Sequence, residues 1–480
     1  MAAETRLLID VGSTSVRALA VDADDRILAR ASRPLKTQEA GRRVEYRAGD
    51  LLAAVEGAAC EAAEGRLIDQ AGLAVQRGSI ACWDRRTGEP LAPVISWRDR
   101  RTADEAPPLP TTDIRMRTGL RFSPYAGAPK IAWCRAHLPA VVQAERRGRL
   151  AAGPLGSFLA ARLGASVQPG CDHTLAQRTL LWSRARRGWD QDLLDAFDIP
   201  ESILPEVVGS TADFGSVGIL PGAPPLRALV GDQNVLPFID GQPDPHTLYV
   251  NLGTGAFLIR PVAEPIDTDR FQLSYLGGDA GFALEGSVHG AGSALAWLAR
   301  HDQGGSRFTP GRLAALDPAA EPSALFLNTI DGLGSPWWCG GPEAAFAGVA
   351  NPESLSFDRR LAAVVESIAF LIRANLEAMN RLTAPPRRII VSGGLGQSDF
   401  LVARLGGLID VELLRLRSAE GTAMGLGALL SDRPLPDAAF EPVPCGTVPA
   451  IERRYGSWLE ALRLHMQDPD DEPGRVRNPR

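Results

Sequence analysis

The chain has 480 residues, a formal net charge of −6 and a hydrophobic content of 45%. Single hydrophobic cores stop growing near roughly 250–300 residues, so this length predicts two domains. The acidic balance argues against a general nucleic-acid binder, which would carry a basic face.

The same sequence also argues against a membrane or secreted protein. No run of about 18 apolar residues occurs, and the best candidate, residues 361–379, is interrupted by charged side chains. The chain opens directly on an expected strand, without the basic and apolar regions of a signal peptide. The six cysteines lack metal-binding or redox spacing, which is typical of a reducing compartment. We therefore expect a cytoplasmic protein that binds neither membranes nor nucleic acids.

Three short strands are expected at the start of the chain. Residues 6–10 and 16–21 are apolar runs separated by a tight turn, and residues 26–31 return after an Asp-rich turn. Residues 48–63 predict the first helix, and residues 73–75 predict a buried strand.

A similar unit recurs in the second half of the chain. Residues 247–251 predict a strand, residues 253–255 (Gly-Thr-Gly) a turn, and residues 256–262 a second strand. The repetition indicates duplicated halves with a ligand between the two equivalent turns.

The remainder of the second half predicts mainly helices. The expected elements are a stretch at 285–298 that ends in a helix, an amphipathic helix at 358–382, a buried strand at 388–391, a helix from about Ser398, and a Gly/Ala-rich helix at 420–430. The last of these could lie close to a neighbour or ligand. We place the domain boundary in residues 241–245, which gives domains 1–240 and 241–435. An extension follows at 436–480, and we expect it to be disordered from about Gln467.

Three Gly-rich turns could bind phosphate, because glycine lets backbone amides approach an anion. They are residues 10–15 (Asp-Val-Gly-Ser-Thr-Ser), 253–255 and 392–394. Any one alone is more often an ordinary turn. The first also carries Asp10, which could hold Mg²⁺, and is followed by Arg17, which could neutralise phosphate charge. The P-loop and protein-kinase motifs are absent, which excludes both of those kinase classes.

Together these motifs resemble the FGGY carbohydrate kinases, and within them most closely the glycerol kinases, from about residue 6 to 430. The matching stretches in chain order are residues 10–17, 76–77, 83–90, 97–102, 189–207, 231–233, 253–255, 285–298, 332–338 and 392–400. The resemblance implies an α/β fold of two actin-like, ribonuclease H-like domains that flank a central cleft for ATP and substrate. It also implies ATP-dependent phosphorylation of a hydroxyl of a small polyol or sugar, with ATP and Mg²⁺ required. A homodimer is left open.

The resemblance assigns Asp232 as the base that removes the proton from the attacking hydroxyl. Such base catalysis is worth roughly 10²–10⁴-fold. Without the resemblance, Asp232 would be interpreted as the cap of a helix that begins near Asn234.

Further site residues follow from the same resemblance. The substrate residues would be Arg77, Gly78, Tyr125, Asp232 and Gln233. Tyr125 could equally be a half-buried core tyrosine. The nucleotide residues would be Gly12, Ser13, Thr14 and Arg17 at the phosphates, Gly253 and Thr254 facing them from the other domain, and Gly393, Gly394 and Asp399 near the adenosine. Asp10 would hold Mg²⁺, usually through water. Asp399 stands where the family often has Asn, which weakens its assignment.

Two positions depart from the glycerol kinase pattern. Gly78 stands where those enzymes carry Glu, whose carboxylate accepts hydrogen bonds from glycerol hydroxyls. Arg98 stands where they carry Gln or Asn; its guanidinium would suit a substrate carboxylate or phosphate, or would face solvent. Because a site built on such hydrogen bonds discriminates strongly, both changes argue against glycerol and favour a larger tetritol or pentulose.

Two other functions compete with an active kinase. A catalytically weak nucleotide-binding regulator could share the fold, but the retention of Asp10, Asp232 and all three turns argues against it. An actin- or chaperone-like ATPase would hydrolyse ATP without a substrate, and the match in the substrate region argues against that function.

Overall fold

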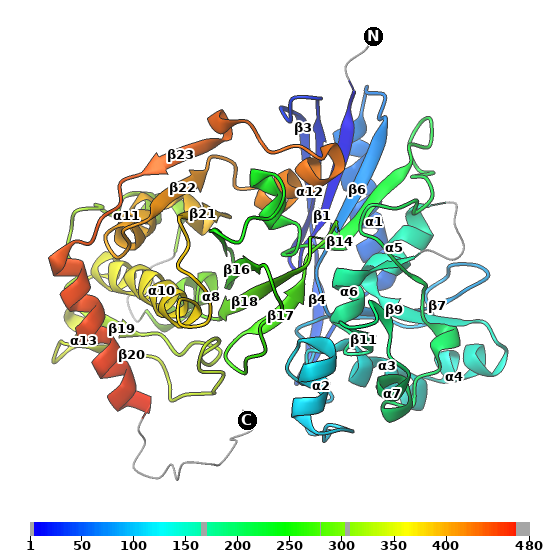
Figure 1. Ribbon diagram of the computed structural model, residues 1–480, viewed down its shortest axis with the longest axis horizontal. Coiled ribbons are helices and arrows are strands. Elements are labelled where there is room, and N and C mark those ends of the chain that lie inside the picture. Colours follow the sequence, from blue (N-terminus) through cyan, green and yellow to red (C-terminus); the bar gives the residue numbers. More distant parts are fainter. Residues whose placement is uncertain (1–3, 165–169, 279, 303–307, 467–480) are drawn as a thin grey trace. The chain divides into compact units, whose positions relative to one another are not determined.

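The computed structural model describes residues 4–164, 170–278, 280–302 and 308–466 (Figure 1). Its described residues form two compact units. Unit 1 lies within Met1–Pro243, Leu273–Ala283 and Thr422–Leu435, and unit 2 within Asp244–Gln272, Leu284–Gly421 and Pro436–Arg480. The units interleave along the chain, and the sequence-based division into 1–240, 241–435 and 436–480 stays a prediction. The expected disordered end, from about Gln467, lies outside the described residues.

The main sheet of unit 1 contains five strands. Their order is β14 (Leu226–Gly231), β6 (Gln70–Val75), β1 (Arg6–Val11), β2 (Ser15–Val21) and β3 (Ile27–Pro34). β1 is antiparallel to β2, whereas β6 is parallel to both β1 and β14. The carboxyl ends of β1, β6 and β14 therefore meet at one edge of this sheet. Every residue of β1 is buried, as expected for a central strand covered on both faces.

A second sheet and several helices complete unit 1. The second sheet has the order β4 (Thr37–Ala40), β5 (Arg43–Tyr46), β8 (Val94–Ile95), β7 (Ile80–Asp84) and β9 (Leu150–Pro154). Two small sheets pair β10 (Cys171–Asp172) with β13 (Val207–Val208), and β11 (Trp182–Ser183) with β12 (Gly188–Trp189). The helices are α1 (Ala48–Ala63), α2 (Thr111–Thr118), α3 (Gly127–His137), α4 (Pro139–Arg146), α5 (Leu155–Leu163), α6 (His173–Gln177), α7 (Gln191–Ala196) and α12 (Gly421–Ser431), with 3-10 turns η1 (Glu201–Ile203) and η2 (Leu236–Asp240).

The larger sheet of unit 2 continues the pattern of unit 1. Its strand order is β18 (Phe282–Val288), β16 (Ala256–Val262), β15 (Thr247–Leu252), β21 (Arg388–Ser392), β22 (Glu412–Leu416) and β23 (Phe440–Val443). β17 (Gln272–Tyr275) falls, except for its first residue, within the Leu273–Ala283 segment of unit 1. β15 and β16 form an antiparallel hairpin, and β21 is parallel to both β15 and β22. The strand–turn–strand repeat predicted from the sequence is confirmed, because β15, β16 and β21 pair as β1, β2 and β6 do.

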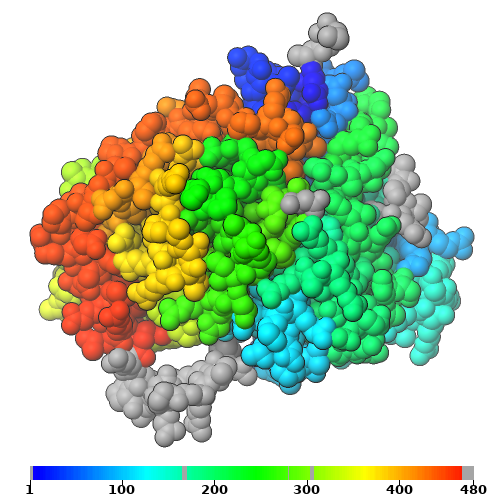
Figure 2. All heavy atoms as spheres, viewed as in Figure 1, coloured from blue at the N-terminus to red at the C-terminus, as the bar shows by residue number. Residues whose placement is uncertain are grey.

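Helices cover the sheet of unit 2. They are α8 (Gly292–His301), α9 (Pro310–Ala314), α10 (Phe357–Met379), α11 (Asp399–Gly406) and α13 (Pro449–Met466), together with the hairpin β19 (Leu325–Leu327) and β20 (Ala345–Ala347) and the 3-10 turns η3 (Pro352–Ser354), η4 (Leu395–Gln397) and η5 (Asp437–Ala439). α10 is buried on nearly all sides, and its first turn is capped by the Ser356 side chain, which accepts from the Arg359 amide. The outer face of α13, red in Figure 2, is exposed at the surface. Within the described parts of the chain, no helix is long and apolar enough to cross a membrane.

The Gly/Ala-rich helix α12 packs closely against protein neighbours, as the sequence indicated. A Cβ on Gly425 would lie 2.5 Å from the Val235 carbonyl oxygen, and one on Gly427 would lie 3.1 Å from Leu8. On the facing strand, a Cβ on Gly72 would lie 2.8 Å from Leu430. These glycines let α12 pack closely against β1 and β6 of the unit 1 sheet. This packing supports β1, the strand that carries Asp10.

Candidate active site

The candidate catalytic edge of unit 1 lies where three parallel strands end. Asp10 is the penultimate residue of β1, and Asp232 directly follows β14. Between them, the Gln76 amide donates to the Val11 carbonyl at 2.8 Å, and the Asp232 amide donates to the Val75 carbonyl at 2.9 Å. These bonds extend the ladder past the strand ends and fix both loops. Two strand spacings, roughly 10 Å, separate the β1 and β14 backbones.

Asp232 lies in a polar environment that orients its carboxylate. Its side chain is 19% exposed, and Oδ1 lies 3.5 Å from Arg77 Nε. The Gln233 amide donates to Oδ1 at 2.9 Å, and the Gln233 side-chain amide donates to Oδ2 at 3.2 Å. A partly exposed carboxylate held in this way can accept a proton from a bound hydroxyl.

The alternative interpretation of Asp232 as a helix cap is wrong. The next helical element is the 3-10 turn η2, which begins at Leu236 rather than near Asn234. Its N-cap residue is Val235, and no side chain caps it. Asn234 instead accepts from Arg77 at 3.0 Å and donates to the Tyr275 carbonyl at 2.6 Å.

The remaining predicted substrate residues cluster in the same unit. Gly78 has φ +75°, and a Cβ there would lie 3.0 Å from the Tyr125 carbonyl oxygen. Tyr125 is 40% exposed, so it is not a core tyrosine, and its ring centroid lies 6.2 Å from that of Trp97. The structure thus brings Arg77 close to Asp232, and Gly78 close to Tyr125.

The first Gly-rich turn connects β1 to β2 at the same edge. The Gly12 amide donates to the Ser15 carbonyl, and the Tyr46 hydroxyl donates to the Ser13 carbonyl at 2.8 Å. Thr14 is exposed. Arg17 stands directly opposite Asp10 in the β1–β2 register, so the two side chains share one face of the sheet.

The chemistry of this edge suits a magnesium ion that is held largely by phosphate and water. Asp10 offers carboxylate oxygens, which Mg²⁺ prefers, and is 8% exposed. Among the residues that the structure describes, no group of three or more His, Cys, Asp or Glu side chains could hold a metal. Mg²⁺ commonly uses only one or two protein carboxylates, so a single side chain such as Asp10 has the chemistry to hold it.

In unit 2 the second and third Gly-rich turns lie side by side. They follow the adjacent parallel strands β15 and β21. Gly393 has φ +84°, and a Cβ there would lie 2.5 Å from the Leu252 carbonyl oxygen. The Gly253 and Thr254 carbonyls accept from the amides of Gly292 and Ser293, at the start of α8. The turns are thus fixed in position on the sheet of unit 2.

Asp399 and Arg98 each have an ion-pair partner. Asp399 begins α11 and pairs with Arg415 at 2.6 Å, with its side chain 70% exposed. Arg98 pairs with Glu39 at 3.2 Å, and both side chains are about half exposed. Arg98 is therefore already engaged by a carboxylate of the protein.

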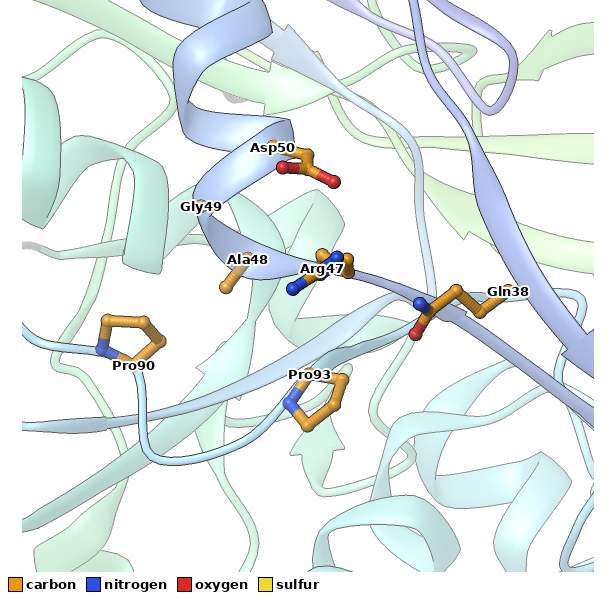
Figure 3. Close-up of a pocket in the computed structure, with 7 residues that line it drawn as sticks. All are labelled: Gln38, Arg47, Ala48, Gly49, Asp50, Pro90 and Pro93. Atoms are coloured by element: carbon orange, nitrogen blue, oxygen red, sulfur yellow. The ribbon is translucent and has the colours of Figure 1, made fainter.

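A pocket of about 620 Å³ lies elsewhere, at the start of α1 (Figure 3). Arg47 and Asp50 of the helix start line it, together with Gln38, Pro90 and Pro93. None of the predicted site residues lines this pocket, so we do not assign the reaction to it.

Three residues that the sequence did not single out contribute to the site. Asn234 binds Arg77, Thr174 binds the amide of Gly231 next to Asp232, and Lys130 binds the carbonyls of Gly78 and Tyr125. One signal was available: Lys130 is one of only two lysines in the chain, and it lies within an otherwise largely apolar helical segment.

Comparison with known proteins agrees with this geometry. The sequence models of the FGGY family of carbohydrate kinases match residues 5–245 for its N-terminal domain and residues 248–430 for its C-terminal domain. The glycerol kinase of Trichlorobacter lovleyi is 34% identical over 444 residues, covering 88% of each chain. That of Methylobacterium nodulans is 35% identical over 485 residues, covering 95% of this chain and 92% of the relative.

Solved structures show the same fold. The glycerol kinase of Plasmodium falciparum with ADP has a TM-score of 0.81 at 20% identity, covering 97% of this chain and 99% of that one. The xylulose kinase of Rhodospirillum rubrum has a TM-score of 0.79 at 20% identity, covering 96% and 98%. The fold is thus the two-domain, actin-like α/β fold expected from the sequence.

Fold and site together define a phosphotransferase that uses an alcohol group as acceptor. The chain belongs to the FGGY family of carbohydrate kinases, and the resemblance drawn from its motifs is confirmed. Membership in this family implies ATP as the phosphoryl donor.

Proposed function

We propose that the protein transfers the γ-phosphoryl group of ATP to a hydroxyl of a small polyol or ketose, with Asp232 as general base. The placement of Asp232 carries this proposal: its carboxylate lies at the carboxyl edge of the sheet, 3.5 Å from Arg77 and partly open to solvent. An alcohol is a poor nucleophile, so a base that removes its proton as the bond forms contributes roughly 10²–10⁴-fold.

The other residues bind and orient the reactants. Arg77, Gly78, Tyr125 and Gln233 contact the acceptor together with Asp232 in this proposal. Gly12, Ser13, Thr14 and Arg17 bind phosphate oxygens, as do Gly253 and Thr254 of unit 2, while Gly393, Gly394 and Asp399 contact the adenosine. Asp10 holds Mg²⁺, usually through water, and the ion supplies neutralisation of phosphate charge when bound. The remaining contribution of the protein is positioning.

Two features support an acceptor larger than glycerol, such as a tetritol or pentulose. Gly78 has a positive φ and a crowded Cβ position, so its backbone does not readily accommodate the carboxylate side chain that glycerol kinases place there. Arg98 is paired with Glu39, so its charge is already balanced within the protein and does not require an acidic acceptor, which favours a neutral polyol or ketose. Without a carboxylate side chain at position 78, the site loses hydrogen bonds that would select glycerol, and the volume that this side chain would fill is open to a larger acceptor. We also propose that the enzyme acts in the cytoplasm and contacts neither nucleic acid nor membrane.

The test is ADP release with a panel of glycerol, erythritol, xylulose and ribulose. We expect at least one tetritol or pentulose to stimulate release from the wild type, and Asp232→Asn to abolish that stimulation. Asp198→Asn, at a fully exposed aspartate of unit 1, is the matched control and should behave as wild type. Acceptor-independent release would instead support an ATPase, and ATP binding without any release would support a regulator. Stimulation that survives in Asp232→Asn would contradict the assignment of the base.

A further inference from the structure

The side chain of Lys130 joins three separate segments of unit 1. It lies in the first turn of α3 and is fully buried, and its Nζ contacts four backbone carbonyl oxygens. The distances are 3.0 Å to Ser96 and Tyr125, and 3.2 Å to Gly78 and Trp97. Within the described part of the chain, the hydrogen-bond partners of this nitrogen are all backbone carbonyl oxygens, so the ammonium cross-links the loops that carry them.

The contacts explain how a buried ammonium is accommodated there. Burial lowers the pKa of Lys130 to about 7, because removing the charged form from water is unfavourable, and the nearby Asp99 carboxylate opposes that shift. An ammonium group has three protons and no acceptor, so four surrounding carbonyls can satisfy all of them. A methionine would fill similar space without the desolvation cost. What the ammonium adds is therefore a fixed arrangement of the four carbonyls.

The joined segments carry the proposed acceptor residues. Gly78 and Tyr125 belong to that set, and Trp97 packs against the Tyr125 ring. The Trp97 amide also donates to the Ser79 hydroxyl at 2.9 Å. In turn, the Ser79 hydroxyl donates to Gln76, whose side-chain amide donates to the Gly12 carbonyl at 2.9 Å. The link from the Trp97 backbone to the first phosphate turn thus runs through Ser79 and Gln76 and not through Lys130.

We propose that Lys130 is a positioning residue for the acceptor site: its ammonium holds the Gly78, Trp97 and Tyr125 backbones in the geometry that binds the polyol or ketose. This inference rests on the proposed function, because it takes Gly78 and Tyr125 as acceptor contacts. Lys130 acts only through the carbonyls, since its side chain is buried. Loss of the ammonium should therefore weaken acceptor binding and leave nucleotide binding largely unchanged.

The first experiment measures steady-state kinetics of Lys130→Met with whichever panel sugar or polyol the wild type uses best. We expect KM for that acceptor to rise at least about tenfold, because small misplacements of a site are costly, while KM for ATP stays within about twofold. Ile131→Ala is the matched control: it removes a buried side chain from the adjacent position of the same helix but no carbonyl contact. An equal rise of acceptor KM in Ile131→Ala, or an equal rise of KM for ATP in Lys130→Met, would overturn the proposal.

A second experiment uses the wild type and does not depend on the variant folding. The chain has two lysines, Lys36 and Lys130, so ¹⁵N-lysine labelling gives two side-chain signals, which a Lys36→Met sample assigns. We expect the same acceptor to shift the Lys130 Nζ signal and leave that of exposed Lys36 unchanged. An unmoved Lys130 signal at saturating acceptor would overturn the inference. Failure of the proposed function would look different, since Asp232→Asn would then retain acceptor-stimulated ADP release.

Discussion

The hydroxyl of Thr174 accepts a hydrogen bond from the backbone amide of Gly231 at 2.7 Å. The same hydroxyl donates to the buried carboxylate of Asp172, which also accepts from the Ser210 hydroxyl at 2.6 Å. Burial raises the pKa of Asp172 to about 6, and the Ser210 hydroxyl opposes that shift. Since Gly231 directly precedes Asp232, this buried network fixes the position of the backbone from which the side chain of the proposed base extends.

We expect Thr174→Val to lower kcat by about tenfold or more, because it keeps the shape of the side chain but leaves the Gly231 amide without its acceptor. Thr174→Ser restores the hydroxyl and should recover most of kcat. Ser210→Ala removes a different donor to Asp172 and does not alter the bond to Gly231, so it serves as the control. Steady-state kinetics with the best acceptor and thermal unfolding of all three variants check this. Equal kcat losses in Thr174→Val and Ser210→Ala would contradict a specific role for the Gly231 bond.

Gly78→Ala tests the conformation of the acceptor loop. A left-handed backbone costs about 1–2 kcal/mol for an L-residue. Gly41 also has a positive φ, +60°, but a Cβ there would meet nothing within 4 Å. Both alanine variants should therefore lose similar stability from backbone strain, with a further loss in Gly78→Ala from crowding against Tyr125. Denaturant unfolding measures the losses, and only Gly78→Ala should raise KM for the acceptor. An acceptor KM that is unchanged in Gly78→Ala would remove Gly78 from the substrate site.

The secondary structure of the chain could be predicted well where apolar periodicity was strong. The expected helix at 48–63 coincides with α1, and the long helix predicted at 358–382 is α10 (Phe357–Met379). The strand–turn–strand repeat was also correct, because apolar runs bounded by Gly-rich turns determine both hairpins. No local pattern indicates which unit α12 joins: it follows β22 in sequence but clusters with unit 1, where its glycines pack against Leu8 and Val235.

The candidate site likewise combines residues that stand in short sequence motifs with residues that are placed there by long-range contacts. The Gly-rich turns and Asp232 stand in short motifs that can be recognised in sequence. The positions of Thr174, Asn234 and Lys130 at the site depend on contacts with residues far along the chain, so local patterns do not predict those contacts, and only the rarity of lysine draws attention to Lys130. Thr174 lies 57 residues from Gly231 in the chain, and Lys130 lies 52 residues from Gly78.

Substitutions of two adjacent glycines of unit 2, Gly393 and Gly394, test stability and nucleotide binding separately. Gly393→Ala should destabilise the protein by roughly 3 kcal/mol, because it combines a positive φ with a Cβ only 2.5 Å from the Leu252 carbonyl oxygen. Gly394 has φ −61° and ψ −40°, and a Cβ there would meet nothing within 4 Å. Gly394→Ala should therefore change stability by less than about 0.5 kcal/mol. If Gly394 borders the adenosine as proposed, this substitution should nevertheless raise KM for ATP. Thermal unfolding and ATP kinetics on both variants decide the matter, and an unchanged KM for ATP in Gly394→Ala would contradict the adenosine assignment.

The buried ion pair between Glu366 of α10 and Arg454 of α13 attaches the C-terminal helix to unit 2. Arg454 Nη2 lies 2.6 Å from the Glu366 carboxylate, which is 1% exposed, and also donates to the Ala324 carbonyl. Arg404 contributes a weaker contact at 3.8 Å. Arg454→Met would leave a buried carboxylate without its main partner, which costs about 3–5 kcal/mol. Replacing both partners with Met removes the unpaired carboxylate but also takes away the Glu366 contact of buried Arg404, so it should recover only part of that loss.

The loss in Arg454→Met should depend on pH in a defined direction. Burial raises the pKa of Glu366 above its ordinary value, and Arg454 opposes that shift. Folded Glu366 therefore binds its proton more tightly than the unfolded chain does, so its contribution to stability is greatest at low pH and falls as pH rises. Without Arg454 the pKa rises further. The stability deficit of the variant should thus be larger at about pH 8 than at about pH 5, where the carboxyl is closer to protonation. Denaturant unfolding of wild type and variant at both pH values measures the deficit, and one that grows on acidification would show that the unpaired Glu366 charge is not its cause.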